Sequence, residues 1–325
     1  MIGIFRTNNR ANILVLLVYA LVLKMRWFAQ PLLPQPLPQD GALYSALLQT
    51  LLALKVPGLV FSLLSFILIF WQALLFNQLL TEQNLIARSN YLPAMTFILV
   101  TSLFPEWNGW SSALLLNVML LFLFRRLIEL NGLQRPQAQL YNLGLLVGLS
   151  TWISHPALIF VGLLYWSLFV MRPFQFREWL ITALGLFTPF YFKGVYVFLT
   201  DQWGKVTLLP KISLGWMGFP QHLSGILVVS LMAFIGLVGV YLVQTNLNKM
   251  LIQVRKSWNL LLFFLPVAVL ASCAYGSNAY PGAVVCSIPV VAFHTAAYYF
   301  SRNKYIALIL HWLTFALAIY VNMWI

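Results

Sequence analysis

Charged residues are scarce in this sequence of 325 residues: 8% are Asp, Glu, Lys or Arg, whereas 62% are hydrophobic. A soluble globular domain carries about 25% charged residues, so this composition excludes a soluble domain as the main part of the chain. The apolar residues recur in runs that approach the ~20 residues a helix needs to cross a bilayer. The sequence therefore predicts a helical integral membrane protein with little mass outside the lipid.

Motifs of the common enzyme classes are also missing. No Walker loop, dinucleotide fingerprint or HExxH motif occurs. The two cysteines, Cys273 and Cys286, lie in or beside apolar runs without metal-ligand spacing, which argues against a disulfide or a metal site. The four histidines are expected at different membrane depths, so we do not expect them to share a metal ion: His155, His222, His294 and His311. We predict neither a metal nor a cofactor.

Eleven apolar segments are candidates for transmembrane helices. The third to the sixth are only ~14 to 16 residues long, so we expect some of them to lean on neighbouring helices or to be re-entrant. The sequence thus predicts an all-α bundle of about ten or eleven transmembrane helices, forming one domain over residues 1–325. The segments are 13–29, 56–80, 92–104, 111–124, 140–154, 157–171, 179–199, 226–243, 260–273, 283–300 and 305–321.

The formal net charge of +13 has a topological interpretation. Its basic residues are scattered singly or in pairs between apolar runs, so we expect membrane lipids and no nucleic acid as partners. Placing the N-terminus inside puts thirteen of the 19 Lys and Arg residues in the cytoplasmic loops. The positive-inside rule therefore predicts a multi-pass protein of a bacterial inner membrane, with a cytoplasmic N-terminus that acts as an uncleaved anchor.

The external loop at about residues 30–55 has the most distinctive pattern. A proline-rich piece leads to Asp40 and Gly41, and a helical pattern follows with Leu43, Leu47, Leu51 and Leu54 on one face. Such an amphipathic helix is expected to lie in the membrane interface. A second external loop spans about residues 200–225.

Two external acids are candidate catalytic residues, because a transfer reaction at this face needs a general base. Asp40 has an alternative interpretation as an Asx turn or helix N-cap before the amphipathic helix. Glu106 follows Pro105 and precedes Trp107, where a solvated turn between two helices is the alternative.

Four external basic or titratable residues are candidates for binding a substrate phosphate. Lys193 lies within an apolar run, where an ionisable residue indicates function, although its amine can also snorkel to the headgroups. Lys205, Lys211 and His222 follow in the next loop, where contacts with lipid headgroups are the alternative.

Three stretches resemble an uncharacterised family of multi-span inner-membrane proteins from Bacteroidota, which covers nearly the whole chain. They are the run from Asn90-Tyr91-Leu92-Pro93 to Pro105, Gly144-Leu-Leu-Val-Gly148 with His155-Pro156, and Met171-Arg172-Pro173-Phe174 leading to Gly185 and Pro189. The order of elements also resembles the GT-C superfamily of glycosyltransferases: Asp40, the helix at 41–55, the glycine-rich helix, and Ala279-Tyr280-Pro281 before a late span. This second resemblance implies transfer of a sugar from a polyprenyl-phosphate carrier.

The leading hypothesis is therefore a GT-C-like membrane protein of envelope glycan or lipid assembly that uses a polyprenyl-phosphate-linked sugar. An alternative is a non-catalytic scaffold for other envelope-assembly membrane proteins, motivated by the single acid in the first loop and the short loops. A lipid or small-molecule transporter ranks below both, because its path would need polar groups at mid-membrane depth, where this sequence has few.

Overall fold

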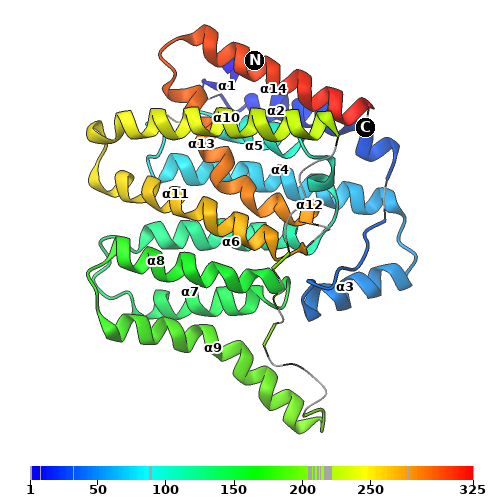
Figure 1. Cartoon of the computed structure of the whole chain (residues 1–325), viewed down its shortest axis with the longest axis vertical. Helices are drawn as coiled ribbons and strands as arrows, with labels where there is room; N and C mark the ends of the chain where they lie inside the picture. Colours follow the sequence, from blue (N-terminus) through cyan, green and yellow to red (C-terminus); the bar gives the residue numbers. More distant parts are fainter. Residues whose placement is uncertain are drawn as a thin grey trace.

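The structure is a computed structural model. It describes residues 2–7, 9–31, 33–87, 90–203, 207, 209–210, 212, 214–215, 222–276 and 279–324. These residues form helices packed into one bundle and no strand (Figure 1). In chain order the helices are α1 Ile2–Phe5, α2 Asn12–Ala29, α3 Ala42–Ala53, α4 Gly58–Glu82, α5 Leu92–Thr101, η1 Pro105–Asn108, α6 Ser112–Glu129, α7 Gln137–Ser150, η2 His155–Phe160, α8 Val161–Met171, α9 Phe176–Leu199, α10 Leu223–Asn246, η3 Leu247–Lys249, α11 Ile252–Cys273, α12 Ala279–Gly282, η5 Ala283–Cys286, α13 Ser287–Phe300 and α14 Lys304–Trp324.

The predicted all-α bundle is confirmed, since a helix lies in each of the eleven apolar segments. Seven helical stretches of the described chain are long and apolar enough to cross a membrane, which makes this a multi-pass membrane protein. The short helix α5 is buried at all ten of its residues, and α13 packs against it. A helix surrounded by other helices need not match the bilayer thickness, which explains how this segment can be so short.

The helix predicted for the first loop is α3. Its two buried side chains, Tyr44 and Leu48, pack beside Phe61 of α4. Leu43 and Leu47, from the predicted apolar face, are exposed. One face of α3 therefore packs against the bundle, and its other face leaves apolar side chains available to lipid.

The two ends of the bundle differ in their polar contacts. One end of the bundle holds α3 and α12, and we call it the α3 end (Figure 1). Asp40 lies just before α3, and Glu106 lies in η1, which packs against α12. At the opposite end, Arg125 pairs with Glu82 at 2.9 Å, and the half-buried Arg172 pairs with Glu178 at 2.9 Å. With Glu129, which pairs with Arg125 at 3.3 Å, three of the six acids are used in ion pairs at this end, whereas Asp40 and Glu106 form no ion pair with a described residue.

Glycines allow the close contact between α7 and α9. A Cβ atom added to Gly144 would lie 2.1 Å from the carbonyl oxygen of Thr182, and one added to Gly185 would lie 2.1 Å from that of Tyr141. Because the obstacles are backbone atoms, no rotamer change could relieve these contacts. The glycine-rich segment of the sequence therefore has a packing role in this protein.

We expect Gly144→Ala to destabilise the bundle by about 1–3 kcal/mol, the usual cost of overpacking, because α7 and α9 must separate to admit the methyl group. Gly162→Ala is the matched control, since a Cβ atom there meets nothing within 4 Å. Thermal unfolding in detergent measures both variants. Equal melting temperatures for the two would contradict the assigned contact.

Candidate functional site

A cavity of about 680 Å³ opens at the α3 end, formed by segments far apart in the sequence. Its walls come from the end of α2, the proline-rich stretch after it, η1, the start of α6, α12 and the end of α14. Pockets that hold small molecules typically measure roughly 300–1,000 Å³, so this cavity has room for one sugar-sized group. The lining residues are Arg26, Trp27, Gln30, Leu33, Pro34, Gln35, Leu37, Pro105, Glu106, Gly109, Trp110, Ser111, Tyr280, Pro281 and Asn322.

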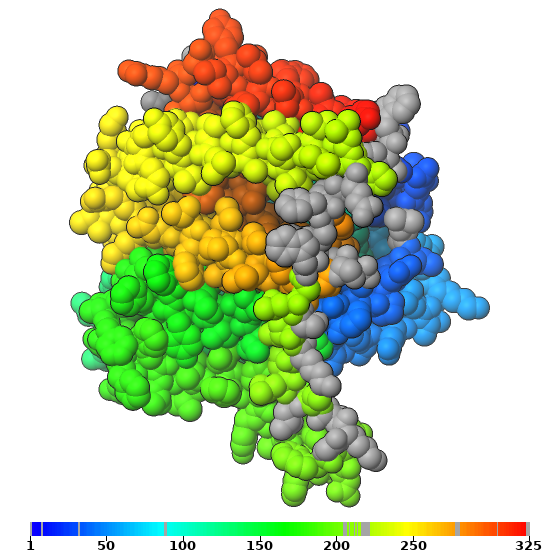
Figure 2. Space-filling model, viewed as in Figure 1, coloured from blue at the N-terminus to red at the C-terminus, as the bar shows by residue number. Residues whose placement is uncertain are grey.

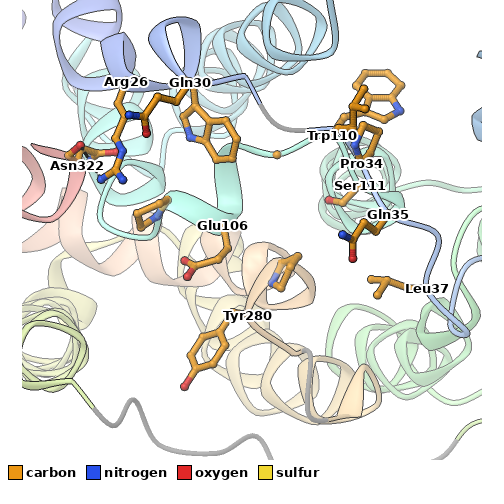
Figure 3. Close-up of a pocket in the computed structure, with 15 residues that line it drawn as sticks. Arg26, Gln30, Pro34, Gln35, Leu37, Glu106, Trp110, Ser111, Tyr280 and Asn322 are labelled. Carbon is orange, nitrogen blue, oxygen red and sulfur yellow. Dashed lines mark hydrogen bonds between the residues drawn. The ribbon is translucent and has the colours of Figure 1, made fainter. Parts of the chain in front are cut away.

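Glu106 and Arg26 are the acid and the cation of this cavity. Figure 3 shows the Glu106 carboxylate in the middle of the lining residues, beside Tyr280, with Arg26 next to Asn322 at one side. Arg26 donates a hydrogen bond from Nη1 to the Asn322 carbonyl oxygen at 3.2 Å. Glu106 is exposed, and its side chain has no hydrogen bond or ion pair within the described part of the chain. The carboxylate is therefore available to a ligand.

A buried lysine holds the turn that carries Glu106. Lys24 of α2 is 2% exposed and donates hydrogen bonds from Nζ to Asn108 of η1 and, at 3.3 Å, to Thr101 of α5. Burying an ammonium group with neutral partners has a cost in stability, so such a residue is usually retained for function. Here it fixes η1 against α2 and so positions Glu106 relative to Arg26.

Asp40 lies behind the wall of the cavity. The backbone of Gln39, Gly41 and Leu43 is hydrogen-bonded to residues 152–155, which follow α7, at 2.9 Å for each bond. Gly41 allows this approach, because a Cβ atom there would lie 2.2 Å from the Trp152 carbonyl carbon. The chain around Asp40 is thereby pinned between α3 and the turn after α7.

The Asp40 carboxylate is 6% exposed and already has partners. It accepts hydrogen bonds from the Leu37 backbone N–H at 2.8 Å and from the Ser112 hydroxyl. It does not cap α3, since the N-cap residue is Gly41. Nearby, the Ser154 and Tyr275 hydroxyls share a hydrogen bond, and the Asp40 charge acts on Tyr275. The Asp40 carboxylate therefore links the proline-rich stretch to the start of α6, and it is not itself among the residues that line the cavity.

Burial raises the pKa of Asp40, and the two hydrogen bonds that it accepts oppose this shift only in part. Because the pKa of Asp40 is raised in the folded protein, its protonated form stabilises the fold. This contribution to the free energy of unfolding is complete below the ordinary pKa of 3.8 and is lost as the pH rises through the pKa of the folded protein. We therefore expect the melting temperature of wild type relative to Asp40→Asn to fall between pH 4 and pH 7. Melting curves of the two proteins in detergent test this, and a difference that is constant over the range would refute it.

Two of the predicted phosphate-binding residues, Lys193 and His222, do not line the cavity. Lys193 lies on α9, donates from Nζ to the Thr207 carbonyl oxygen at 2.8 Å, and interacts electrostatically with His155. His222 is the exposed N-cap residue of α10. Lys205 and Lys211 lie outside the described residues. Of the two predicted catalytic acids, the structure brings Glu106 to the cavity and places Asp40 directly behind it.

Residue patterns pointed to some of this site and missed the rest. Arg26 follows the first apolar segment as one of the scattered basic residues, and no motif in the sequence marks it. Tyr280 and Pro281, which line the cavity, were noted in the sequence only as part of a motif before a late span. Ser112, Ser154 and Tyr275 carry no signal in the sequence, because hydroxyl side chains are common near helix ends.

Metal ligands do not gather in this structure: no group of three or more His, Cys, Asp or Glu side chains that could hold an ion occurs among the described residues. His294 and His311 are fully buried inside the bundle, where the rings of His311 and Tyr19 stack with their centres 6.2 Å apart.

In comparisons with known proteins, no family model, curated protein or solved structure matches this chain. The assignment of function therefore depends on the cavity and its residues.

Proposed function

We propose that this protein is an inner-membrane glycosyltransferase of envelope assembly that uses a sugar linked to a polyprenyl phosphate. The proposal rests on one cavity at the end of a transmembrane bundle that holds both the arginine Arg26 and the carboxylate of Glu106, which has no partner among the described residues. A carboxylate suits a general base, and a guanidinium group binds phosphate through two parallel hydrogen bonds.

The reaction follows from these two groups. Glu106 accepts the proton of an acceptor hydroxyl, whose oxygen forms a bond to the anomeric carbon of the sugar. The bond between that carbon and the phosphate oxygen breaks, and the lipid phosphate leaves with the electron pair. Arg26 stabilises the negative charge that develops on the leaving phosphate. The proton lost by the acceptor hydroxyl is the one that Glu106 accepts, and no atom changes its oxidation state, so the step needs no oxidant or reductant.

Features around the cavity support a lipid-linked substrate. The exposed apolar side chains of α3, Leu43 and Leu47, favour contact of the neighbouring surface with lipid. Trp27 and Trp110 line the cavity, and tryptophan is enriched where hydrocarbon meets headgroups. A phosphate at Arg26 would thus lie at headgroup depth, with its lipid in the membrane.

Mass spectrometry of lipid-linked sugars and surface glycans in a deletion strain tests the proposal. We expect a sugar-bearing polyprenyl phosphate to accumulate and one glycan to disappear, and expression of the wild-type chain to reverse both changes. Unchanged glycans and carrier lipids in the deletion strain would exclude this activity and favour the scaffold hypothesis.

A further inference from the structure

A second cavity, of about 570 Å³, lies within the membrane-spanning part of the bundle between α10, α11 and α13. Its lining is apolar, with Met232 and Val240 from α10, Leu265 from α11, and Val290 and Phe293 from α13. Figure 2 shows the furrow from outside, with α13 visible at its base between α10 and α11. A furrow of this kind in a bilayer is open to hydrocarbon.

The packing of the helices explains why the furrow exists. α10 packs mainly against α13, and α11 packs mainly against η2, α8 and η5, so the two consecutive helices diverge. Gly239 brings α10 close to α13, because a Cβ atom there would lie 1.9 Å from the Phe293 carbonyl oxygen. One turn away, Gly236 lines the cavity, and a Cβ atom there would meet only His294, at 3.8 Å. The furrow is thus built by the helix arrangement and has room beside Gly236.

The two cavities adjoin at η1 and α12. Tyr280 lines both of them. Along η1, Glu106 lines the cavity at the α3 end and its neighbour Trp107 lines the second cavity. On the other side, Pro281 lines the first and Ala283 the second. A cavity that holds an acid and a cation therefore adjoins an apolar one at membrane depth, which is the arrangement that suits an amphiphile.

We infer that the apolar cavity holds the hydrocarbon chain of the polyprenyl phosphate whose headgroup lies at Arg26, an inference that rests on the proposed function. A volume of about 570 Å³ lies within the range of pockets for one small molecule, so the cavity encloses the part of the chain nearest to its phosphate and the rest extends into the bilayer. The chain enters sideways between α10 and α11, and Phe104, Trp107 and Tyr280 surround the point where it meets its phosphate.

The two cysteines of the chain report on this cavity, because Cys273 and Cys286 both line it. In the Cys286→Ser variant, Cys273 is the one remaining thiol, and its reaction with a membrane-permeant maleimide can be followed by intact-mass spectrometry. The protein is placed in nanodiscs of phosphatidylethanolamine and phosphatidylglycerol, with or without long-chain polyprenyl phosphate. At about ten times its Kd, the lipid occupies about nine-tenths of the sites, so labelling should slow about tenfold.

Three comparisons make the test specific. Gly236→Leu, made in the Cys286→Ser background, fills the cavity and should abolish protection by polyprenyl phosphate, whereas Gly162→Leu, at an open position of α8, should leave it intact. Uncharged polyprenol should protect much less than polyprenyl phosphate, because it lacks the group that binds Arg26. Equal labelling with and without polyprenyl phosphate, equal protection by polyprenol, or full protection in Gly236→Leu would each overturn the inference. The assay needs no sugar and no turnover. Protection of Cys273 in a protein without transferase activity would therefore support binding of the polyprenyl chain in the apolar cavity and would reject only the proposed reaction.

Discussion

Replacing Glu106 by Gln is expected to lower the rate of sugar transfer by roughly 10²–10⁴-fold, the contribution of a positioned general base. Glutamine keeps the size of the side chain in the cavity but cannot accept the proton of the acceptor hydroxyl. Because Glu106 is exposed and makes no contact that the fold needs, the variant should melt at the wild-type temperature. Transfer from the lipid-linked sugar to the acceptor, measured with purified protein in nanodiscs, gives the rate.

Asp201→Asn is the matched control for this substitution. Asp201 is an exposed acid expected on the same side of the membrane, and it does not line the cavity. The control should keep the wild-type rate. If Glu106→Gln retained more than about half of the rate, general-base catalysis by Glu106 would be wrong, since that loss is far below the expected range.

Replacing Arg26 by Met is expected to lower kcat/KM for the lipid-linked sugar by roughly 10²–10³-fold, the usual effect of removing one group that stabilises a developing negative charge. Methionine retains the apolar part of the side chain and removes the guanidinium group. The kcat/KM of Arg26→Lys should lie between that of Arg26→Met and that of wild type, because lysine restores the positive charge but not the two parallel hydrogen bonds. Kinetics over a range of donor concentrations separate the effect on kcat from that on KM.

Lys55→Met is the control for Arg26, since Lys55 is an exposed cation at the same end of the bundle, outside the cavity. Its kinetics should match those of wild type. Arg26 also bonds the Asn322 carbonyl at 3.2 Å, so melting temperatures are needed to separate catalysis from stability. A folded Arg26→Met protein with wild-type kcat/KM would remove Arg26 from the mechanism.

The helices could be predicted from the sequence because their signal is local. An apolar run defines a span, and Gly41 or Gly144 marks a close contact even when the partner is unknown. The partners themselves were not predictable: the contact of Gly144 with Thr182 joins residues far apart in the chain. The all-α fold class therefore followed from the sequence, whereas the arrangement of helices did not, and seven helical stretches of the described chain are long enough to span where ten or eleven were predicted.

The candidate site shows the same limit. Asp40 was the leading catalytic candidate because an acid before an interfacial helix is conspicuous, yet its carboxylate is buried against Leu37 and Ser112. The sequence favours a solvated turn for Glu106, and only the folding of η1 against α12 and Lys24 of α2 brings it into a cavity with Arg26. Local sequence indicates which residues are polar and where they lie along a span, but not which of them meet.

Complementation of the deletion strain tests the central claim most directly. The strain receives wild type, Glu106→Gln or Asp201→Asn at verified equal expression, and its lipid-linked and surface glycans are measured by mass spectrometry. We predict that wild type and Asp201→Asn restore the missing glycan, while Glu106→Gln leaves it absent and leaves the sugar-bearing carrier lipid accumulated. Full restoration by Glu106→Gln would contradict a catalytic role for this cavity.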